Sequence, residues 1–464
     1  MAVETDCNPP PSAGHKAPTR DLTTGSIHRA ILFLAPAMVL EVAIISISEL
    51  FDTFWVSRLG SAALAAVTFG IAVRWFVNSL PMGLGTGGMA MVARRVGARD
   101  REAADHAAGQ TILLGLILSL LLTVVGLALA RPLLQLMGAE AEVMPLGVTY
   151  LRITFLGSFA WVLVWVINPM IRGAGEARLA MWVLVLITTV IVVSEPILVL
   201  GLGPVPRLGI AGSAGAYVLG FGCGSLVQIV MLVRGRACVG LKLRHLRPDL
   251  PLMSRIIGIA LPGAVQMTLR SASNIVLVGL VGSFGTFATA GFGLADRILL
   301  WILLPTLGLG NAAGTLVGQN LGAKKPSRAE RCAAWVSAYA IIYMLVACTL
   351  VCVFAASLGA FFDPTPEVVA IGSMAIRVIT FSLILDGIGI VLGRSMDGAG
   401  NTVPSAVVNL VTLWGLQLTV AFALSKWLGF GLLGIWLARA LANAANGLLL
   451  AAWFRRGRWK EREV

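Results

Sequence analysis

The chain has 464 residues, 58% of them hydrophobic and 12% charged, with a mean hydropathy of +0.89. This composition leaves too little polar surface for a soluble protein, so it excludes a soluble fold and indicates an all-α polytopic membrane protein. The net charge of +13 would suit a protein that binds nucleic acid, but the cations gather at the ends of apolar segments. We therefore expect the lipid bilayer as a partner, and no nucleic acid.

Twelve apolar segments follow a polar N-terminal tail, and each can cross about 30 Å of hydrocarbon. The predicted spans are 29–56, 62–88, 109–130, 145–171, 179–202, 209–233, 254–281, 286–316, 333–358, 368–394, 403–426 and 430–454. The sequence thus predicts the following parts: a cytoplasmic tail at 1–28, an N-lobe of helices 1–6 at 29–233, a basic cytoplasmic linker at 234–253, a C-lobe of helices 7–12 at 254–454 and a cytoplasmic tail at 455–464.

The basic residues are divided unequally between the two sides of the predicted membrane. Most Lys and Arg lie in the tails and the even-numbered connections, whereas the opposite connections hold Arg58, Arg131, Arg207 and Lys426. Cytoplasmic loops of membrane proteins carry such an excess, so both termini are predicted to be cytoplasmic.

The two halves of the chain are copies of each other at a spacing of 225 residues. Gly60 recurs as Gly285, Arg152 as Arg377, and the Gly-Ala-Gly at 173–175 as that at 398–400. So constant a spacing over several landmarks indicates duplication. Because each unit has an even number of spans, we expect two pseudo-symmetric six-helix lobes entering the membrane in one direction, with a transport path between them.

Prolines lie at matching depths in helices 1, 2, 7 and 8, at Pro36, Pro81, Pro262 and Pro305. A proline inside a helix frees a backbone carbonyl and favours a bend. We expect hinges there, with Pro36 the one that matters for transport.

Six acids lie inside the predicted spans: Glu41, Glu49, Asp52, Glu195, Asp296 and Asp386. A carboxylate at the bilayer centre costs about 3 kcal/mol or more, so such residues usually face a cavity or a partner. At the repeat spacing, the first four correspond to Gln266, Asn274, Leu277 and Val420. The second half keeps the scaffold without these carboxylates, so the fold does not need them.

Asp52 and Glu195 are the strongest candidates for a coupling site. At about 1.5 Å per residue they lie within about 3 Å of the same depth in the outer half of the N-lobe, so the two could face each other. Two carboxyl groups in a poorly hydrated pocket can share a proton and release it when water enters. Glu49, nearer the outer surface, is either a third coupling residue or a solvated one.

The expected substrate cavity adjoins these acids. Glu41 falls about 20° from Asp52 around helix 1, near the midplane, and is as suited to substrate contact as to carrying protons. Four aromatic residues lie near the N-lobe acids, Phe51, Trp55, Trp161 and Trp165. Most tryptophans of a membrane protein are packing or interface residues, but a few beside carboxylates would suit a flat cationic ligand.

A second charged cluster is predicted in the C-lobe. Asp296 adjoins Arg297, and Asp386 enters at a level that Arg270 can reach, so ion pairs are expected within this lobe. Arg74 and Arg297 occupy nearly equivalent places in the two halves, which indicates a structural role for both.

Several segments together resemble the multidrug and toxic compound extrusion (MATE) family. They are FDTFWVSRLGSAALAAV (51–67), RRVGARDREAA, GQNLGAKKPSRAE, RGAGEARLAMWV (172–183), LGIAGSAGAY (208–217) and GFGLLGIW (429–436). The resemblance implies an antiporter of the bacterial inner membrane, monomeric and not an enzyme. It would export small organic cations or amphipathic drugs in exchange for H⁺ or Na⁺.

In the DinF-like branch of that family, an Asp of the helix 1 motif and an Asp before a helix 5 proline form the N-lobe site. The resemblance carries these roles to Asp52 and Glu195. This chain departs from the family at Glu49 and Ile191, where Asn is usual, and at Tyr217, where Thr is common. A lost amide and an added carboxylate favour H⁺ over Na⁺, with Tyr217 beside the coupling site.

Other functions remain open at this point. A Na⁺-coupled MATE antiporter fits the same scaffold, and a lipid-linked sugar flippase would show a more cationic cavity. Another 12-helix facilitator would not explain a resemblance that runs through both halves. An intramembrane enzyme fits worst, because all four histidines lie in tails or loops and no metal triad is evident. We expect no cofactor and no metal, only the H⁺ gradient or, in the alternative, a Na⁺ gradient.

Overall fold

The computed structural model describes residues 21–201 and 206–462, which contain helices and no strand. The predicted tail at 1–28 lies mostly outside the described residues. The helices are α1 (Ile27–Ser57), α2 (Ser61–Gly97), α3 (Arg101–Leu136), α4 (Val143–Leu156), α5 (Ser158–Gly173), α6 (Ala177–Leu200), α7 (Ile210–Val233), η1 (Leu243–Leu246), α8 (Leu250–Gly282), α9 (Thr286–Gly322), α10 (Pro326–Val353), α11 (Ala355–Phe362), α12 (Pro366–Ile379), α13 (Ser382–Gly398), α14 (Val403–Asn409), η2 (Leu410–Leu418), α15 (Thr419–Phe422), η3 (Ala423–Trp427), α16 (Gly431–Arg455) and η4 (Arg458–Lys460).

Ten helical segments of the described chain are long and apolar enough to cross a membrane, and two bent pairs raise the number to 12. The bent pairs are α4 with α5, at 55°, and α12 with α13, at 57°. This confirms the predicted all-α polytopic fold. The bends lie at Gly157 and near Phe381, positions that the repeat spacing almost superimposes.

The helices that contain the four matched prolines continue across them. Pro36 lies inside α1, Pro81 inside α2, Pro262 inside α8 and Pro305 inside α9. The sharp breaks of the fold therefore lie elsewhere than at these prolines, and Pro36 as a hinge stays a prediction.

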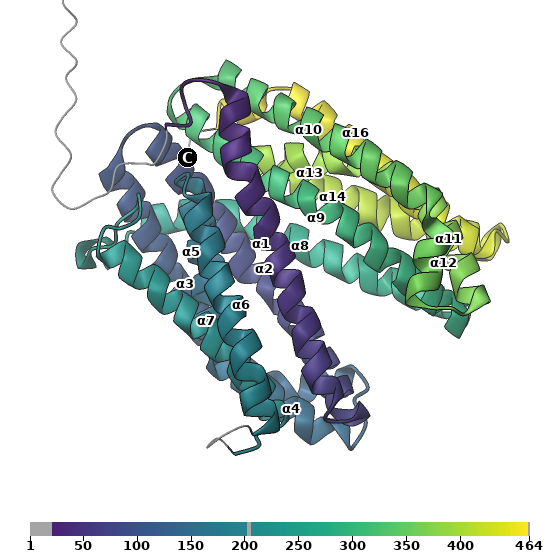
Figure 1. Ribbon diagram of the computed structural model, residues 1–464. Helices are drawn as coiled ribbons and strands as arrows, with labels where there is room; N and C mark the ends of the chain where they lie inside the picture. The colour runs from purple at the N-terminus through teal and green to yellow at the C-terminus, as the bar shows by residue number, and fades with distance from the viewer. Residues whose placement is uncertain (1–20, 202–205, 463–464) are drawn as a thin grey trace, which may run out of the picture.

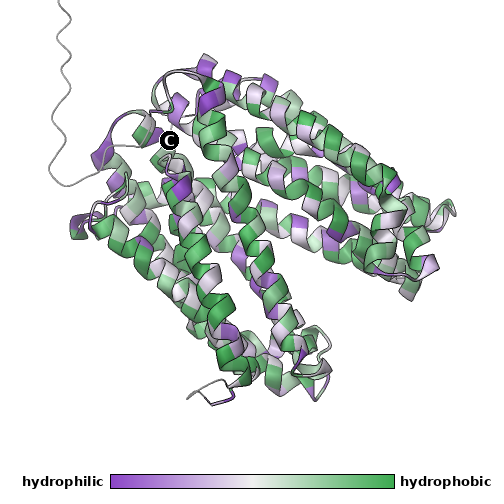
Figure 2. Ribbon diagram, viewed as in Figure 1, coloured by the Kyte–Doolittle hydropathy of each residue, from purple (hydrophilic) through white to green (hydrophobic). Residues whose placement is uncertain are grey.

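The helices form two lobes, α1–α7 and α8–α16, which meet at one end and diverge toward the other (Figure 1). Both described ends of the chain lie where the lobes meet. There Lys325 Nζ donates to the carbonyl of Thr23 at 3.0 Å, and Arg94 Nη2 donates to that of Arg462 at 2.6 Å. Figure 2 shows hydrophilic residues gathered at this end, with mostly apolar residues along the helices beyond it. The molecule is thus closed at the end that carries its termini.

A pair of repeat-related glycines holds the lobes together at the closed end. A Cβ on Gly97 of α2 would overlap the carbonyl of Gln319 on α9, and one on Gly322 of α9 would overlap the carbonyl of Arg94 on α2. Gly97 corresponds to Gly322, and Arg94 to Gln319, at the repeat spacing. The lobes thus meet through two equivalent backbone contacts that need glycine.

The predicted basic linker folds against α3. Gln110 Nε2 donates to the carbonyls of His245 and Arg247, both at 2.7 Å. Asp249 caps α8, and its Oδ2 lies 3.0 Å from His106 Nε2. The hydrogen bond from His106, with that from the Leu252 N–H, holds the pKa of the Asp249 carboxyl below its usual value. Because the pKa of Asp249 is lowered in the folded chain, its ionised carboxyl group stabilises the cap of α8 at neutral pH. This stabilisation is lost as the pH falls through the folded-state pKa of Asp249.

We predict that Gly97→Ala destabilises the contact between the lobes. The added methyl group would press on a backbone carbonyl that cannot move alone, at a cost of about 1–3 kcal/mol. The thermal unfolding midpoint of the purified variant should fall below that of the wild type. Gly258→Ala, where a Cβ meets nothing within 4 Å, is the control and should leave the midpoint unchanged or raise it. Equal midpoints for both variants would contradict the close contact.

Candidate functional site

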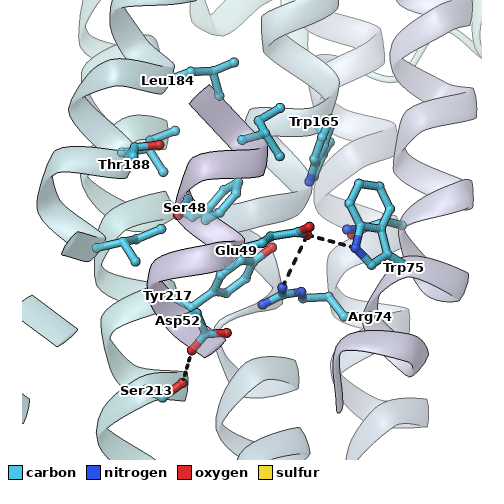
Figure 3. Close-up of a pocket in the computed structure, with 15 residues that line it drawn as sticks. Ser48, Glu49, Asp52, Arg74, Trp75, Trp165, Leu184, Thr188, Ser213 and Tyr217 are labelled. Carbon is cyan, nitrogen blue, oxygen red and sulfur yellow. Dashed lines mark hydrogen bonds and ion pairs between the residues drawn. The ribbon is translucent and has the colours of Figure 1, made fainter. Parts of the chain in front are cut away.

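Asp52 lies on α1 where this helix packs beside α7. Its side chain is buried, and its Oδ1 accepts a hydrogen bond from Ser213 Oγ of α7 at 2.7 Å. Figure 3 shows this contact at the base of a pocket in the N-lobe. A carboxyl group held by one hydroxyl donor keeps a free oxygen for a second partner.

Glu195 of α6 supplies that partner. It is fully buried, and its carboxyl group lies close enough to that of Asp52 for the two to interact electrostatically. Among the described residues, no donor reaches either oxygen of Glu195. Two carboxyl groups can hydrogen-bond to each other only when one of them carries a proton. The structure therefore brings together the two acids that depth and repeat asymmetry single out.

Arg74 of α2 is the cation of this pocket. Its Nη1 donates to the Tyr150 hydroxyl at 3.2 Å, and its guanidinium lies 4.1 Å from the centre of the Tyr217 ring. Its Nη2 is 3.9 Å from Glu49 Oε1, and it attracts Asp52 as well. Arg74 thus compensates part of the negative charge of these acids in a poorly hydrated pocket.

Glu49 and the aromatic residues form the more open side of the pocket. Glu49 is half-buried, and its Oε1 accepts from Trp75 Nε1 at 2.9 Å. Trp165 and Tyr217 line the same pocket (Figure 3). The pocket holds about 50 Å³. Drug-sized ligands need several hundred Å³, whereas a water molecule needs about 30 Å³, so this pocket suits water and protons.

Most of the residues predicted to line a substrate cavity lie outside this pocket. Glu41 is buried against Arg172 of α5, whose Nη1 donates to Glu41 Oε2 at 2.8 Å. Trp161 is packed in the N-lobe core and donates its Nε1 hydrogen to the carbonyl of Thr154. Of the five residues expected to line the cavity, only Trp165 lines the pocket.

Phe51 and Trp55 also lie outside the pocket, although they share α1 with Asp52. Phe51 is exposed. Trp55 packs edge-on against Phe54, under the guanidinium of Arg58. Each helical residue turns by about 100°, so neighbours of Asp52 in sequence point elsewhere, and the role of Phe51 and Trp55 in a substrate cavity stays a prediction.

The C-lobe charges pair differently from the prediction. Asp296 Oδ1 accepts from Arg439 Nη2 of α16 at 2.6 Å, and Arg297 is exposed. Adjacent helical residues do not face each other, which is why the expected Asp296–Arg297 pair is wrong. The expected contact of Arg270 with Asp386 does form, at 3.6 Å.

Sequence reasoning missed Arg74 and Ser213 as pocket residues, and Tyr150 as the partner of Arg74. Arg74 was assigned a structural role because Arg297 stands near its repeat position, yet the 225-residue spacing leads to Leu299. At the same spacing, Tyr150 corresponds to Ala375 and Ser213 to Ala438. Strict use of the spacing would have identified these residues, because the C-lobe lacks them just as it lacks the acids.

Two similar helical lobes, closed at one end and with a buried carboxyl pair in one lobe, define a class of protein. Membrane transporters with parallel repeats are built in this way. The comparisons with known proteins identify the family. The MatE family model matches residues 37–197 and 262–423, once in each repeat. The chain belongs to the MATE family and is a membrane transporter, not an enzyme.

Relatives and solved structures match along nearly the full chain. The probable multidrug resistance protein YoeA of Bacillus subtilis is 26% identical over 96% of this chain and 97% of its own length. An FAD transporter of Shewanella oneidensis is 27% identical over 92% of this chain and 94% of its own. A crystal structure of MATE in the bent conformation is 27% identical, with a TM-score of 0.89, and covers 95% of this chain and 97% of that chain.

We predict that Arg74→Met destabilises the N-lobe. Removing the buried cation leaves Glu49 and Asp52 without its charge and the Tyr150 hydroxyl without its donor, a loss of about 1–3 kcal/mol. The measurement is the free energy of unfolding of the purified protein in denaturant. Arg58→Met is the control, since Arg58 is exposed over the Phe54 ring and should cost less than about 1 kcal/mol. Equal losses would mean that Arg74 does not balance the acids.

Proposed function

We propose that the chain exports amphipathic organic compounds in exchange for protons, by alternating access between its two lobes. The observation that carries this proposal is the burial of Glu195 close to Asp52, where no donor from residues 21–201 or 206–462 reaches either oxygen of Glu195. At neutral pH one proton bridges the two carboxyl groups. Its release when water enters the pocket leaves two negative charges in a dry place, which favours a different arrangement of the lobe.

Proton coupling is favoured over sodium coupling by two features of the pocket. Arg74 already places a permanent positive charge beside Asp52 and Glu49, and it would repel a sodium ion. Ile191 lines the pocket at the position where an amide would supply a neutral oxygen ligand. Hard cations need several oxygen ligands, so the loss of one weakens a sodium site further.

The cycle follows from where the pocket and the lobes lie. The positive-inside pattern supports cytoplasmic termini and a bacterial inner membrane, so the lobes diverge toward the outside. Protons from outside reach the N-lobe pocket and neutralise it. Helix α1 then bends at Pro36 and the bound compound is expelled. Assignment to the DinF-like branch rests on the same two acids.

The class of substrate depends on charges outside this pocket. A preference for cations would need free carboxylates, but Glu41 is paired with Arg172 and Glu49 with Arg74. The names of the relatives support organic substrates of more than one kind, since one is called a multidrug resistance protein and another an FAD transporter.

We predict that Asp52→Asn and Glu195→Gln each abolish proton-driven transport without unfolding the protein. Purified protein in lipid vesicles is given an imposed pH gradient and, separately, an imposed Na⁺ gradient, and movement of ethidium and of riboflavin is followed by fluorescence. The pH gradient should drive transport in the wild type, and each variant should lower the rate at least about tenfold.

Asp363→Asn, in the loop between α11 and α12, is the control and should keep the wild-type rate. Full activity of either pocket variant under the pH gradient would rule out this coupling site. If only the Na⁺ gradient drives transport, the coupling ion is sodium and not the proton.

A further inference from the structure

Three arginines gather where the two lobes meet. Arg172 comes from α5 of the N-lobe, and Arg270 and Arg394 come from α8 and α13 of the C-lobe. Arg394 lies within electrostatic range of both of the others. Three like charges at one place repel one another in a medium of low dielectric constant, so each of them needs a carboxylate partner.

Backbone contacts locate this group at the junction of the lobes. The carbonyl of Arg172 accepts from Thr315 Oγ1 of α9 at 3.3 Å, which links the lobes. Gly314, the residue before Thr315, packs against the carbonyl of Arg394 and close to Met89 of α2. Two residues before Arg270, Thr268 donates to Ser79 of α2 at 2.9 Å.

Each arginine has a buried carboxylate behind it. Arg172 lies 2.8 Å from Glu41, Arg270 lies 3.6 Å from Asp386, and Arg394 lies 3.8 Å from Asp397. The three carboxylate side chains are 1%, 5% and 1% exposed, whereas the arginine side chains are 14%, 42% and 19% exposed. The acids therefore sit in the protein and hold the guanidinium groups, while the accessible surface of the group is cationic.

The guanidinium groups keep unused donors. Each has five N–H groups in a planar fork that fits phosphate and carboxylate oxygens. Arg172 donates one of these N–H groups to Glu41, and its buried Nε has no acceptor among the described residues. Within the described chain, Arg270 and Arg394 make ion pairs at 3.6 Å and 3.8 Å, too long for a good hydrogen bond.

We propose that Arg172, Arg270 and Arg394 form a binding site for an amphipathic organic anion that carries a phosphate or carboxylate group. The ligand's anionic group would take the free guanidinium donors of both lobes, and its apolar part would lie against the apolar side chains beside them. This inference rests on the proposed export function and names its substrate class. A ligand bound across the junction would contact both lobes, so its binding would depend on how the two lobes are arranged.

The test compares two probes that differ by one phosphate group. Riboflavin 5′-phosphate and riboflavin share the same fluorescent ring, so fluorescence quenching on the purified, full-length protein gives the affinity of each. The phosphorylated probe should bind at least about tenfold more tightly. This advantage should shrink at high salt, because screening weakens charge–charge contacts.

A charge-balanced variant tests the arginines themselves. Arg270→Gln with Asp386→Asn removes one cation and the acid behind it, so no unpaired charge is left buried. It should reduce the preference for the phosphorylated probe at least about tenfold and leave riboflavin binding unchanged. Arg99→Gln with Asp21→Asn removes a surface pair of the same kind, 3.4 Å apart, and should change nothing. Equal affinities of the two probes for the wild type, or an unchanged preference in the variant, would overturn the proposal.

Binding and transport separate this inference from the proposed function. If the wild type prefers the phosphorylated probe but no pH gradient moves any probe, the anion site stands and proton-driven export fails. If a pH gradient drives ethidium while the phosphorylated probe has no advantage, export stands and the anion site fails.

Discussion

The proposed coupling depends on the free-energy cost of placing two carboxyl groups near each other where water is scarce. Asp52 and Glu195 have one hydroxyl donor between them, from Ser213, and no described donor reaches Glu195. Such a pair is tolerable with one shared proton and unfavourable without it. Arg74 supplies a permanent positive charge next to them. This charge lowers the cost of ionising the second carboxyl group when the shared proton leaves. In the proposed cycle, a proton changes the charge of this pocket, which is too small for a drug-sized molecule.

The two lobes share one scaffold but differ in the polar residues that they carry. The repeat contributes symmetry where the lobes touch, at Gly97 and Gly322, because both copies need the same close approach. The symmetry is lost at the N-lobe pocket, because the C-lobe has no carboxylates at the positions that match Asp52 and Glu195. This pocket is too small for a drug. The junction of the lobes, with its three arginines, is the better place for a ligand. In the proposed cycle, proton and ligand act at different sites, and movement of α1, which carries both Asp52 and Glu41, connects them.

The fold could be predicted almost fully from the sequence, because spans of apolar residues and a 225-residue repeat are direct physical signals. Depth and repeat asymmetry also predict that Asp52 and Glu195 lie near each other, and their role in coupling stays a prediction. The cavity could not be predicted in the same way. Helical periodicity shows which way Glu41 points, but not that Arg172, 131 residues further along the chain, meets it there. Arg74 was missed for a different reason, since near-equivalence of two positions was treated as equivalence.

Infrared difference spectroscopy tests the central claim most directly, because a protonated carboxyl group absorbs apart from a carboxylate. The purified protein in lipid would be titrated from neutral to alkaline pH, with Glu195→Gln measured alongside. The account predicts that the wild type at neutral pH has a protonated-carboxyl band that disappears on titration and that the variant loses. An unchanged band in Glu195→Gln, or a wild type without any such band at neutral pH, would contradict a shared proton at this pair.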